Sequence, residues 1–545
     1  MSRSDTAVWF QRAYSGNPIC SPTRASLLTG RTPARTCIYA VEQHILCREG
    51  ADGCARGELS VANLTQAHQY LSGFFGKWHL GSLSDRGVGS PDCYAKPSDQ
   101  SCQLGYWEKD GGCCFGTDGA KLQVSHPLQF GFDEFVATPE CAASATSNCG
   151  CFFYPSAHND SACELGHYAP THSVPYHECM QYYKGSAHAD GSTTVEPLTS
   201  VSGVDDEDWL IDHVERLVDR GEAEQRPFLA VVFFHGVHIP YVATPAMRAK
   251  YVAKGFDANE ADYWGTISQI DAAVGRVRAL LQARGIANNT WLSLTADNGP
   301  EVNPSGGQGT GSYANPGRTA GLRGRKRDVT EGGTRVIGLV EYPPAVSPLR
   351  ARVEPYFPIS TMDLFPTVAD LLGLDPPALG RPLDGISLLP VLRGEMATRP
   401  QHAGIGIHGS FPYGDTNHQL DPATGQLVVP FRCPKDSASA RLGDIPVNFA
   451  SAAHGGWQFS WAEGNELKLF GCSGYCNGNN CNSTAPGFAN PGWHFFLYNL
   501  TADRTEDVDL WEPLRPKAQA MLGRFLEWQQ SVLHSQGADE IGCAL

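Results

Sequence analysis

The sequence lacks three features that would each indicate a class of protein. It has no apolar run close to the about 20 residues that a helix needs to cross a bilayer. Its first residues, Met1-Ser2-Arg3-Ser4-Asp5, have none of the apolar character of a signal peptide. It has no excess of positive charge, because 41 Lys and Arg face 57 Asp and Glu, for a net charge of −16. These absences argue against a membrane span and against nonspecific nucleic-acid binding. Taken alone, this N-terminus would suggest the cytosol.

Cysteine content points to a different compartment. The chain has 18 cysteines, and disulfides persist in oxidising compartments. Sequons for N-glycosylation agree with passage through the secretory pathway, although they also occur by chance, so the cysteines carry more weight. The sequence therefore predicts a secretory-pathway protein, either extracellular or lysosomal. The sequons lie at Asn63, Asn159, Asn288, Asn482 and Asn499.

Half of the cysteines fall between Cys93 and Cys179, in a stretch rich in Gly, Ser and Pro with weak periodicity. We expect an insertion stapled by disulfides over about 93–179. A zinc cluster is the alternative interpretation. Cys113-Cys114 and Cys149-Gly150-Cys151 argue against it, because structural zinc sites use paired cysteines with a C-x₂₋₄-C spacing.

The length of 545 residues exceeds what one hydrophobic core usually supports, so we expect two domains. Residues 1–398 would form the larger α/β domain, and 399–545 a smaller one with short strands and glycine-rich turns. In the larger domain, two apolar runs at 227–234 and 290–295 are predicted to be strands, the first buried on both faces.

A helix is predicted between these two strands. Apolar residues over 261–284 recur at helical spacing, and Gly285 is a suitable stop. Strand, helix and strand together imply a parallel crossover. Ligands bind beyond the carboxyl ends of the strands in open α/β sheets, and His238 and Asp297 both follow a predicted strand.

The segment 20–30, C-S-P-T-R-A-S-L-L-T-G, carries the strongest chemical signal. Pro22 suits the first turn of a helix, so we expect Cys20 just before a helix start. Free backbone amides at a helix N-terminus favour an anion. The segment therefore predicts a cysteine placed next to an anionic substrate.

This segment resembles the C-x-P-x-R…T-G signature of the type I sulfatases. Four later segments resemble further parts of that pattern in the same order, at 70–81, 233–240, 295–301 and 322–336. The resemblance implies an alkaline-phosphatase-like α/β sandwich with a mostly parallel central sheet between helices. It also implies a smaller C-terminal α+β domain with a four-stranded antiparallel sheet. The layout is most similar to the arylsulfatase and N-acetylgalactosamine-6-sulfatase branch.

The resemblance implies a reaction centred on Cys20. The formylglycine-generating enzyme of the secretory pathway would convert Cys20 to formylglycine, and the hydrated aldehyde would attack the sulfur of a sulfate ester. Arg24 would hold the hydrate, while Lys77 and Lys326 would bind sulfate oxygens.

Two histidines and a metal complete the implied site. His238 would protonate the leaving oxygen, and His79 would take the proton of the second hydroxyl, so that sulfate leaves and the aldehyde returns. The modified Cys20, Asp297 and Asn298 would bind one divalent cation, Ca²⁺ as usual in the family, with Mg²⁺ as the alternative. His235 matches no family role and is expected to be structural or to support the site.

The sequence departs from the family pattern in two places. Family members carry a hydrophobic strand that ends in adjacent aspartates, two of the metal ligands, well before the cysteine. Here Asp5 is the only acidic residue before Cys20. We therefore expect an N-terminally truncated chain that binds Ca²⁺ poorly and is inactive as written. The family also more often has glycine where Arg325 and Arg327 stand.

Three functions remain open from the sequence. The first is a sulfuric ester hydrolase acting on an aryl sulfate or a sulfated sugar. A phosphatase or phosphodiesterase of the same fold is the second, but those relatives use serine or threonine and two zinc ions, which Cys20 disfavours. The third is a secreted binding protein or pseudoenzyme without catalysis.

Overall fold

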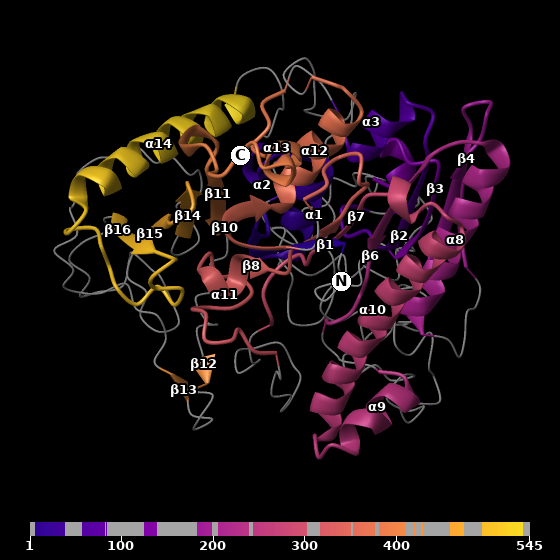
Figure 1. Ribbon diagram of the computed structural model, residues 1–545, viewed down its shortest axis with the longest axis horizontal. Coiled ribbons are helices and arrows are strands. Elements are labelled where there is room, and N and C mark those ends of the chain that lie inside the picture. The colour runs from indigo at the N-terminus through magenta and orange to yellow at the C-terminus, as the bar shows by residue number, and fades with distance from the viewer. Residues whose placement is uncertain are drawn as a thin grey trace, which may run out of the picture.

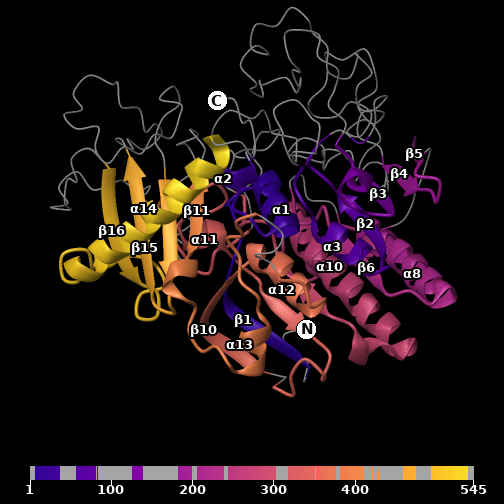
Figure 2. The same cartoon turned by 90° about the horizontal axis from the view of Figure 1, so that it is seen from above.

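The computed structural model describes most of the chain and defines two sheets in the part predicted to be the larger domain and one principal sheet in the part predicted to be the smaller one (Figures 1 and 2). The predicted insertion at 93–179 lies mostly outside the described residues. These are 6–36, 38, 57–81, 83, 125–138, 182–198, 205–238, 243–301, 317–349, 352–375, 381–409, 419–420, 427–428, 458–473 and 493–537.

The first sheet contains the N-terminal strand of the described chain. β1 (Ala7–Tyr14) runs parallel to β10 (Arg352–Ser360) and antiparallel to β9 (Leu339–Glu341). β7 (Leu292–Leu294) pairs with the outer side of β9, and the short β8 (Arg335–Val336) pairs with β1. A core cluster of buried aliphatic and aromatic side chains lies against β1 and β10.

The second sheet has the order β5-β4-β3-β2-β6. β2 (Leu71–Lys77) is central, fully buried and parallel to both β3 (Glu134–Thr138) and β6 (Phe228–Phe233). β4 (Tyr183–Ala187) and β5 (Thr193–Pro197) extend the sheet in antiparallel pairing. The carboxyl ends of β2 and β6 therefore lie side by side.

The predicted strands and helix at 227–295 are present, but their arrangement differs from the prediction. β6 and β7 lie at the edges of two different sheets and share no ladder, so no parallel crossover joins them within one sheet. The prediction that the strand at 227–234 is buried on both faces was also wrong. In β6 only Val231 is buried, because an edge strand has a neighbour on one side alone.

Long helices lie beside the second sheet (Figure 1). α10 (Ala258–Ala283) matches the predicted helix at 261–284, and Gly285 follows it with a left-handed φ of 70°. α8 (Asp206–Glu224) packs Leu210 and Val214 against β2 and β6. The other helices of the described larger domain are α1 (Cys20–Thr29), α2 (Pro33–Thr36), α3 (Val61–Gln66), η2 (Pro127–Phe130), α9 (Pro245–Val252), η3 (Ala287–Asn289), α11 (Glu331–Thr334), η4 (Thr361–Asp363), α12 (Leu364–Leu371) and α13 (Leu389–Arg393).

The C-terminal part contains the four-stranded antiparallel sheet that the sequence predicts. Its order is β11-β14-β15-β16, and α14 crosses one face of it (Figure 2). Aromatic residues of β14, β16 and α14 fill the space between sheet and helix. The elements are η6 (Gln401–Ala403), β11 (Ile405–Gly409), β12 (Gln419–Leu420), β13 (Leu427–Val428), β14 (Gln458–Glu463), β15 (Leu467–Ser473), β16 (Trp493–Asn499) and α14 (Arg515–Gly537).

A buried ion cluster joins the C-terminal sheet to the larger domain. Nζ of Lys468 in β15 lies 3.0 Å from a carboxylate oxygen of Glu331 and 3.0 Å from one of Glu506. Glu506 also accepts a hydrogen bond from the backbone N–H of Glu331. The cluster therefore fixes α11, which closely follows Lys326 in the sequence. Among the described helices, none is long and apolar enough to cross a membrane.

Candidate active site

Cys20 lies at the N-terminus of α1, where its side chain is almost fully buried with 2% exposure. The helix begins at Cys20 itself, slightly earlier than predicted, and Ile19 before it is extended. Sγ of Cys20 lies 3.5 Å from Oδ1 of Asn298. Position 20 therefore combines the free amides of a helix start with the loop that follows β7.

Arg24 lies one helical turn after Cys20 on the same face of α1. Its Nη1 donates to the backbone carbonyl of Lys77 at 2.7 Å, and its Nη2 lies 2.8 Å from Oδ2 of Asp297. The guanidinium also lies 4.8 Å from the ring centre of Phe233 at the end of β6. Arg24 thus contacts the carboxyl ends of β2 and β6 and the segment after β7.

Lys77 ends β2 and is 1% exposed. Within the described part of the chain, its Nζ has no hydrogen-bond partner. Burial lowers the pKa of Lys77 to about 8, although Cys20 and Asp297 oppose that shift. A buried ammonium group without a partner is costly, so this position suits a lysine that binds an anionic ligand.

Asp297 and Asn298 follow β7 and face α1. Burial alone would raise the pKa of Asp297, but Arg24, Lys77 and Lys326 lower it to about 2. Asp297 is therefore a carboxylate at any physiological pH. These three positive charges come from different parts of the fold, as expected for a site at strand ends.

Lys326, the second lysine of the site, has several close polar partners. Its Nζ lies 3.1 Å from Nε2 of His238 and 2.8 Å from Oε2 of Glu301. Burial would lower the pKa of Lys326, but Cys20 and Glu301 raise it above its ordinary value. The chain thus brings Lys326 and His238 together, as predicted, and adds Glu301 to them.

His79 follows Lys77 by two residues and is fully buried. Its backbone has a left-handed φ of 56°, which is uncommon for a residue other than glycine. Strain of this kind persists only where the surrounding structure imposes it and is frequent at functional sites. The described contacts bring together Cys20, Arg24, Lys77, His238, Asp297, Asn298 and Lys326.

Glu301 and Arg327 are site residues to which the sequence assigned no role. Arg327 forms an ion pair with Oε1 of Glu301, and its Nη2 lies 3.4 Å from Oε2. Both residues stand inside segments that resemble the family motifs, at 295–301 and 322–336. The position of Arg327 next to Lys326 in the sequence was a signal that could have placed it in the site. The sequence could not show that the carboxylate of Glu301 contacts both Lys326 and Arg327.

His235 lies at the end of β6 in a buried network. Its Nδ1 lies 2.8 Å from Oδ2 of Asp206, and its Nε2 lies 2.9 Å from Oγ1 of Thr138. The Tyr182 hydroxyl donates to the same oxygen of Asp206. Both ring nitrogens are thereby engaged, which agrees with the expectation of a structural or supporting role. The His235 carbonyl accepts from the backbone N–H of His238.

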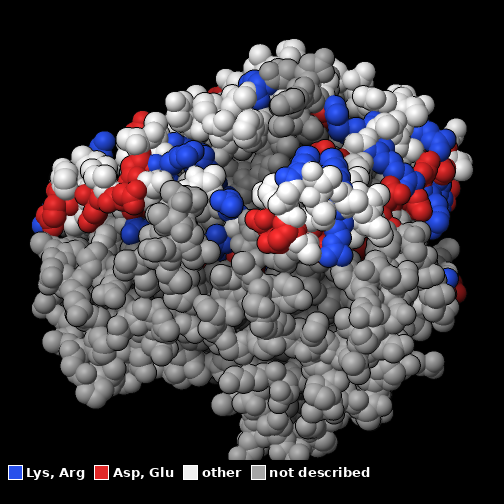
Figure 3. Space-filling model, turned by 90° about the horizontal axis from the view of Figure 1, so that it is seen from below, with Lys and Arg blue, Asp and Glu red and all other residues white. Residues whose placement is uncertain are grey.

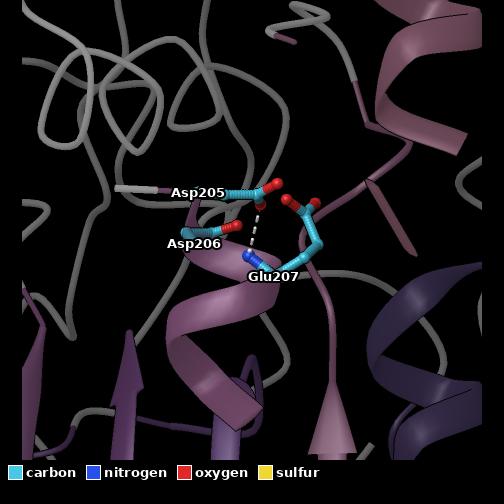
Figure 4. Close-up of side chains that lie close together, drawn as sticks. All are labelled: Asp205, Asp206 and Glu207. Carbon is cyan, nitrogen blue, oxygen red and sulfur yellow. Dashed lines mark hydrogen bonds between the residues drawn. The ribbon is translucent and has the colours of Figure 1, made fainter. Parts of the chain in front are cut away.

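Three acidic residues at the start of α8 form a cluster that could hold a metal ion (Figure 4). Asp205 caps the helix by accepting from the N–H of Glu207, and Asp206 faces His235. Oε2 of Glu207 accepts from the side-chain amide of Gln269. Burial raises the pKa of Glu207 well above its ordinary value. These contacts explain the cluster as a helix cap and a histidine partner.

Surface charge gives no support to a polyanion partner. On the described part of the face in Figure 3, Lys and Arg lie beside Asp and Glu and do not gather in one patch. The positive charges of the site are instead buried, as Lys77 and Lys326 illustrate. The site therefore suits a small anionic group.

The donor set partly fits a hard divalent cation. Asp297 and Asn298 provide a carboxylate and an amide oxygen close to Cys20, the kinds of ligand that Ca²⁺ and Mg²⁺ take. However, Ca²⁺ takes about six to eight oxygens, and Oδ2 of Asp297 is already bound to Arg24. The oxygens near Cys20 among the described residues fit the cation in type but are too few for a complete shell.

Comparisons with known proteins agree with this geometry. A family model for sulfatases matches residues 2–374. The chain therefore belongs to the sulfatase family.

Curated relatives include mouse steryl-sulfatase, 29% identical over 71% of this chain and 59% of the relative. Canine N-acetylgalactosamine-6-sulfatase is 27% identical over 72% of this chain and 60% of the relative. Human arylsulfatase D is 26% identical over 74% and 65%, respectively. The match thus spans about 60% of the length of the first two relatives.

Solved structures share the fold at lower sequence identity. The crystal structure of Ps i-CgsB with k-i-k-neocarrahexaose has a TM-score of 0.59 at 17% identity, over 99% of this chain and 88% of that one. The PsFucS1 sulfatase from Pseudoalteromonas sp. has a TM-score of 0.56 at 17% identity, over 99% and 85%. These likenesses confirm the predicted alkaline-phosphatase-like class of fold.

Proposed function

We propose that this protein hydrolyses sulfate monoesters by means of a formylglycine made from Cys20. The observation that carries the proposal is the position of Cys20, buried at a helix N-terminus and close enough to Lys77 and Lys326 to act on the pKa of each. A sulfate ester carries its negative charge on nonbridging oxygens, so two buried lysines near position 20 suit it. Phosphate-cleaving relatives would need serine or threonine at this position.

The residues of the chain divide the work of binding and proton transfer. Formylglycine, when present, supplies the oxygen nucleophile. Arg24 holds position 20 against Asp297 and the end of β2. Lys77 provides an unpartnered positive charge for one sulfate oxygen, and Lys326 would bind another.

His238 is the proposed proton donor to the departing oxygen. Nζ of Lys326 lies 3.1 Å from its Nε2, so in the absence of substrate the ammonium group can donate a hydrogen bond to that nitrogen. Movement of Lys326 toward a sulfate oxygen would end this hydrogen bond, and Nε2 would then take up a proton from water and pass it to the leaving oxygen. His79 is the proposed base that restores the aldehyde, on resemblance to the family.

Ca²⁺ is the proposed cofactor, with Mg²⁺ as the alternative, and Asp297 and Asn298 would hold it. Because these two residues supply only one carboxylate, we expect weak binding, with a dissociation constant on the order of millimolar. Calorimetric titration of Ca²⁺ into the protein and into Asp297→Asn would measure it. Submicromolar binding by the unaltered protein would show that other residues complete the shell.

The proposed substrate is an aryl sulfate or a sulfated sugar. The names of the relatives include both a steryl-sulfatase and an N-acetylgalactosamine-6-sulfatase, so they support either class. Residence in the secretory pathway, extracellular or lysosomal, is proposed from the 18 cysteines and the sequons. Asn288 is an exposed sequon among the described residues.

The decisive experiment combines mass spectrometry with turnover. Protein made in a secretory host should contain an aldehyde at position 20. The proposed function predicts that it cleaves a chromogenic aryl sulfate, and such turnover would overturn the expectation from the sequence that this chain is inactive. Cys20→Ala should fold normally and lose turnover. An unmodified Cys20 without turnover would favour a binding protein or pseudoenzyme, and full activity of Cys20→Ala would exclude the formylglycine mechanism.

A further inference from the structure

The carboxylate of Glu301 lies between two cations of the site. Its Oε2 is 2.8 Å from Nζ of Lys326, and its Oε1 forms an ion pair with Arg327. The Glu301 side chain is 11% exposed and that of Lys326 is 5% exposed, so water screens this group of charges poorly. Each charge therefore strongly affects what the others can bind.

Arg327 holds this position at a conformational cost. Its backbone has a φ of 82°, in the left-handed region that favours glycine. The Arg327 N–H donates to the carbonyl of Pro18 at 2.9 Å, just before Cys20. Glycine would adopt this backbone conformation without strain. The Arg327 side chain must therefore make a contribution that offsets the strain.

The charges of the group indicate what that contribution is. Lys326 and Glu301 alone sum to zero, and a lysine neutralised in this way attracts an anion weakly. Arg327 returns the group to a net charge of one positive unit. It also pairs with Oε1 of Glu301 and lies 3.4 Å from Oε2, so the carboxylate divides its charge between two cations.

We propose that Arg327 is a positioning residue that engages Glu301, so that Lys326 keeps an effective positive charge for an oxygen of the sulfate group. This inference rests on the proposed function, because it assigns a sulfate oxygen to Lys326. It makes Arg327 act through Glu301 and not through contact with the substrate. A direct contact and a purely structural role predict different results for paired substitutions.

The test measures binding of inorganic sulfate by calorimetry to the unaltered protein, Arg327→Ala, Glu301→Gln and the double variant. Arg327→Ala should weaken sulfate binding on the order of tenfold, since it leaves Lys326 neutralised. Glu301→Gln should bind at least as tightly as the unaltered protein. The double variant should regain binding to within about threefold, because no carboxylate remains to neutralise Lys326.

Two further variants separate charge from backbone effects. Arg327→Gly should be as stable as the unaltered protein or more so, yet bind sulfate as weakly as Arg327→Ala. Arg284→Ala removes an equal charge from a surface pair with Asp219 and should leave binding unchanged. Thermal unfolding of every variant shows whether the fold is kept.

The outcomes also separate this inference from the proposed function. A double variant as weak as Arg327→Ala would overturn the inference and indicate direct contact with the anion. The absence of sulfate binding by the unaltered protein would overturn it as well. Rescue of sulfate binding in a protein without sulfatase turnover would support the inference while contradicting the proposed hydrolysis.

Discussion

The two lysines that face position 20 show opposite ways of burying a positive charge. Lys77, at the end of β2, has no hydrogen-bond partner for Nζ in the described chain, and its pKa falls to about 8. Lys326, in the loop before α11, contacts Glu301 and His238, and its pKa rises. Among the described residues, Lys77 therefore lacks a hydrogen-bonded counterion, whereas Lys326 already has one in Glu301.

The difference indicates separate tasks for two residues of the same type. An unpartnered charge on a rigid central strand gains most from an incoming anion, so Lys77 suits the binding of sulfate. A lysine that contacts both a histidine and a carboxylate can change its hydrogen bonds as protons are transferred during the reaction. Lys326 therefore suits both binding and the coupling of binding to His238.

Removal of either lysine should produce the largest effect. Lys77→Ala and Lys326→Ala should each lose roughly 2–4 kcal/mol of transition-state stabilisation, about 30- to 900-fold in kcat, as for loss of a preorganised charge-stabilising donor. Steady-state kinetics with an aryl sulfate measure this. Activity of both variants within twofold of the unaltered protein would remove the lysines from the site.

Glu301→Gln distinguishes the two lysines in double variants. Lys326→Ala leaves Glu301 facing the substrate with one cation fewer, so adding Glu301→Gln should recover part of the loss. Adding the same change to Lys77→Ala should recover little, because the positive charges that lower the pKa of Glu301 are those of Arg327 and Lys326. Equal recovery in both backgrounds would contradict the comparison.

A pH profile gives the next largest effect. Lys77 must be protonated to attract sulfate, so kcat/KM should fall about tenfold per pH unit above the pKa of about 8. Lys77→Arg keeps its charge and should move this alkaline limb to higher pH, even if its maximum rate is lower. An unchanged alkaline limb in Lys77→Arg would assign the titration to another group.

Stability should show the smallest effect. Lys77→Met removes a buried unpartnered charge and should raise the free energy of unfolding at pH 6 by about 1 kcal/mol or more. Between the folded pKa of about 8 and the ordinary value for lysine, the unfolded chain binds more protons. Rising pH therefore stabilises the unaltered protein, and the advantage of the variant should shrink.

Denaturant titrations at pH 6 and pH 10 would measure both parts of this prediction. Lys184→Met is the matched control, because Lys184 is 52% exposed in a surface pair with Glu196. That change should stay within about 0.5 kcal/mol at either pH. A Lys77→Met protein less stable than the unaltered one at pH 6 would show that Lys77 has a stabilising partner.

Local elements of the fold were predictable, but their pairing was only partly so. The helical spacing over 261–284 gave α10, and the apolar run at 227–234 gave β6. Apolar composition does not report which strands share a ladder, so it missed that β6 and β7 are edges of separate sheets. Burial of β6 was overestimated for the same reason.

The site was predictable where a residue stands next to a recognisable turn or strand end. Cys20 stands at a predicted helix start and Asp297 follows a predicted strand, whereas Lys77 was assigned only from the family resemblance; the structure brings the three together. Glu301 was not given a role, because its position between Lys326 and Arg327 depends on loop geometry. A one-dimensional pattern does not encode that two cations converge on one carboxylate.

The Lys468 cluster carries a consequence for the timing of synthesis. Lys468 fixes Glu331 in α11, shortly after Lys326, so the pocket that buries Cys20 depends on residues made roughly 450 positions later than Cys20. At about 5–20 residues per second, that interval is on the order of 20 to 90 s. During this interval the proposed modifying enzyme would have access to a thiol that the finished fold covers. Translation speed would therefore set how many molecules leave the ribosome with position 20 already modified.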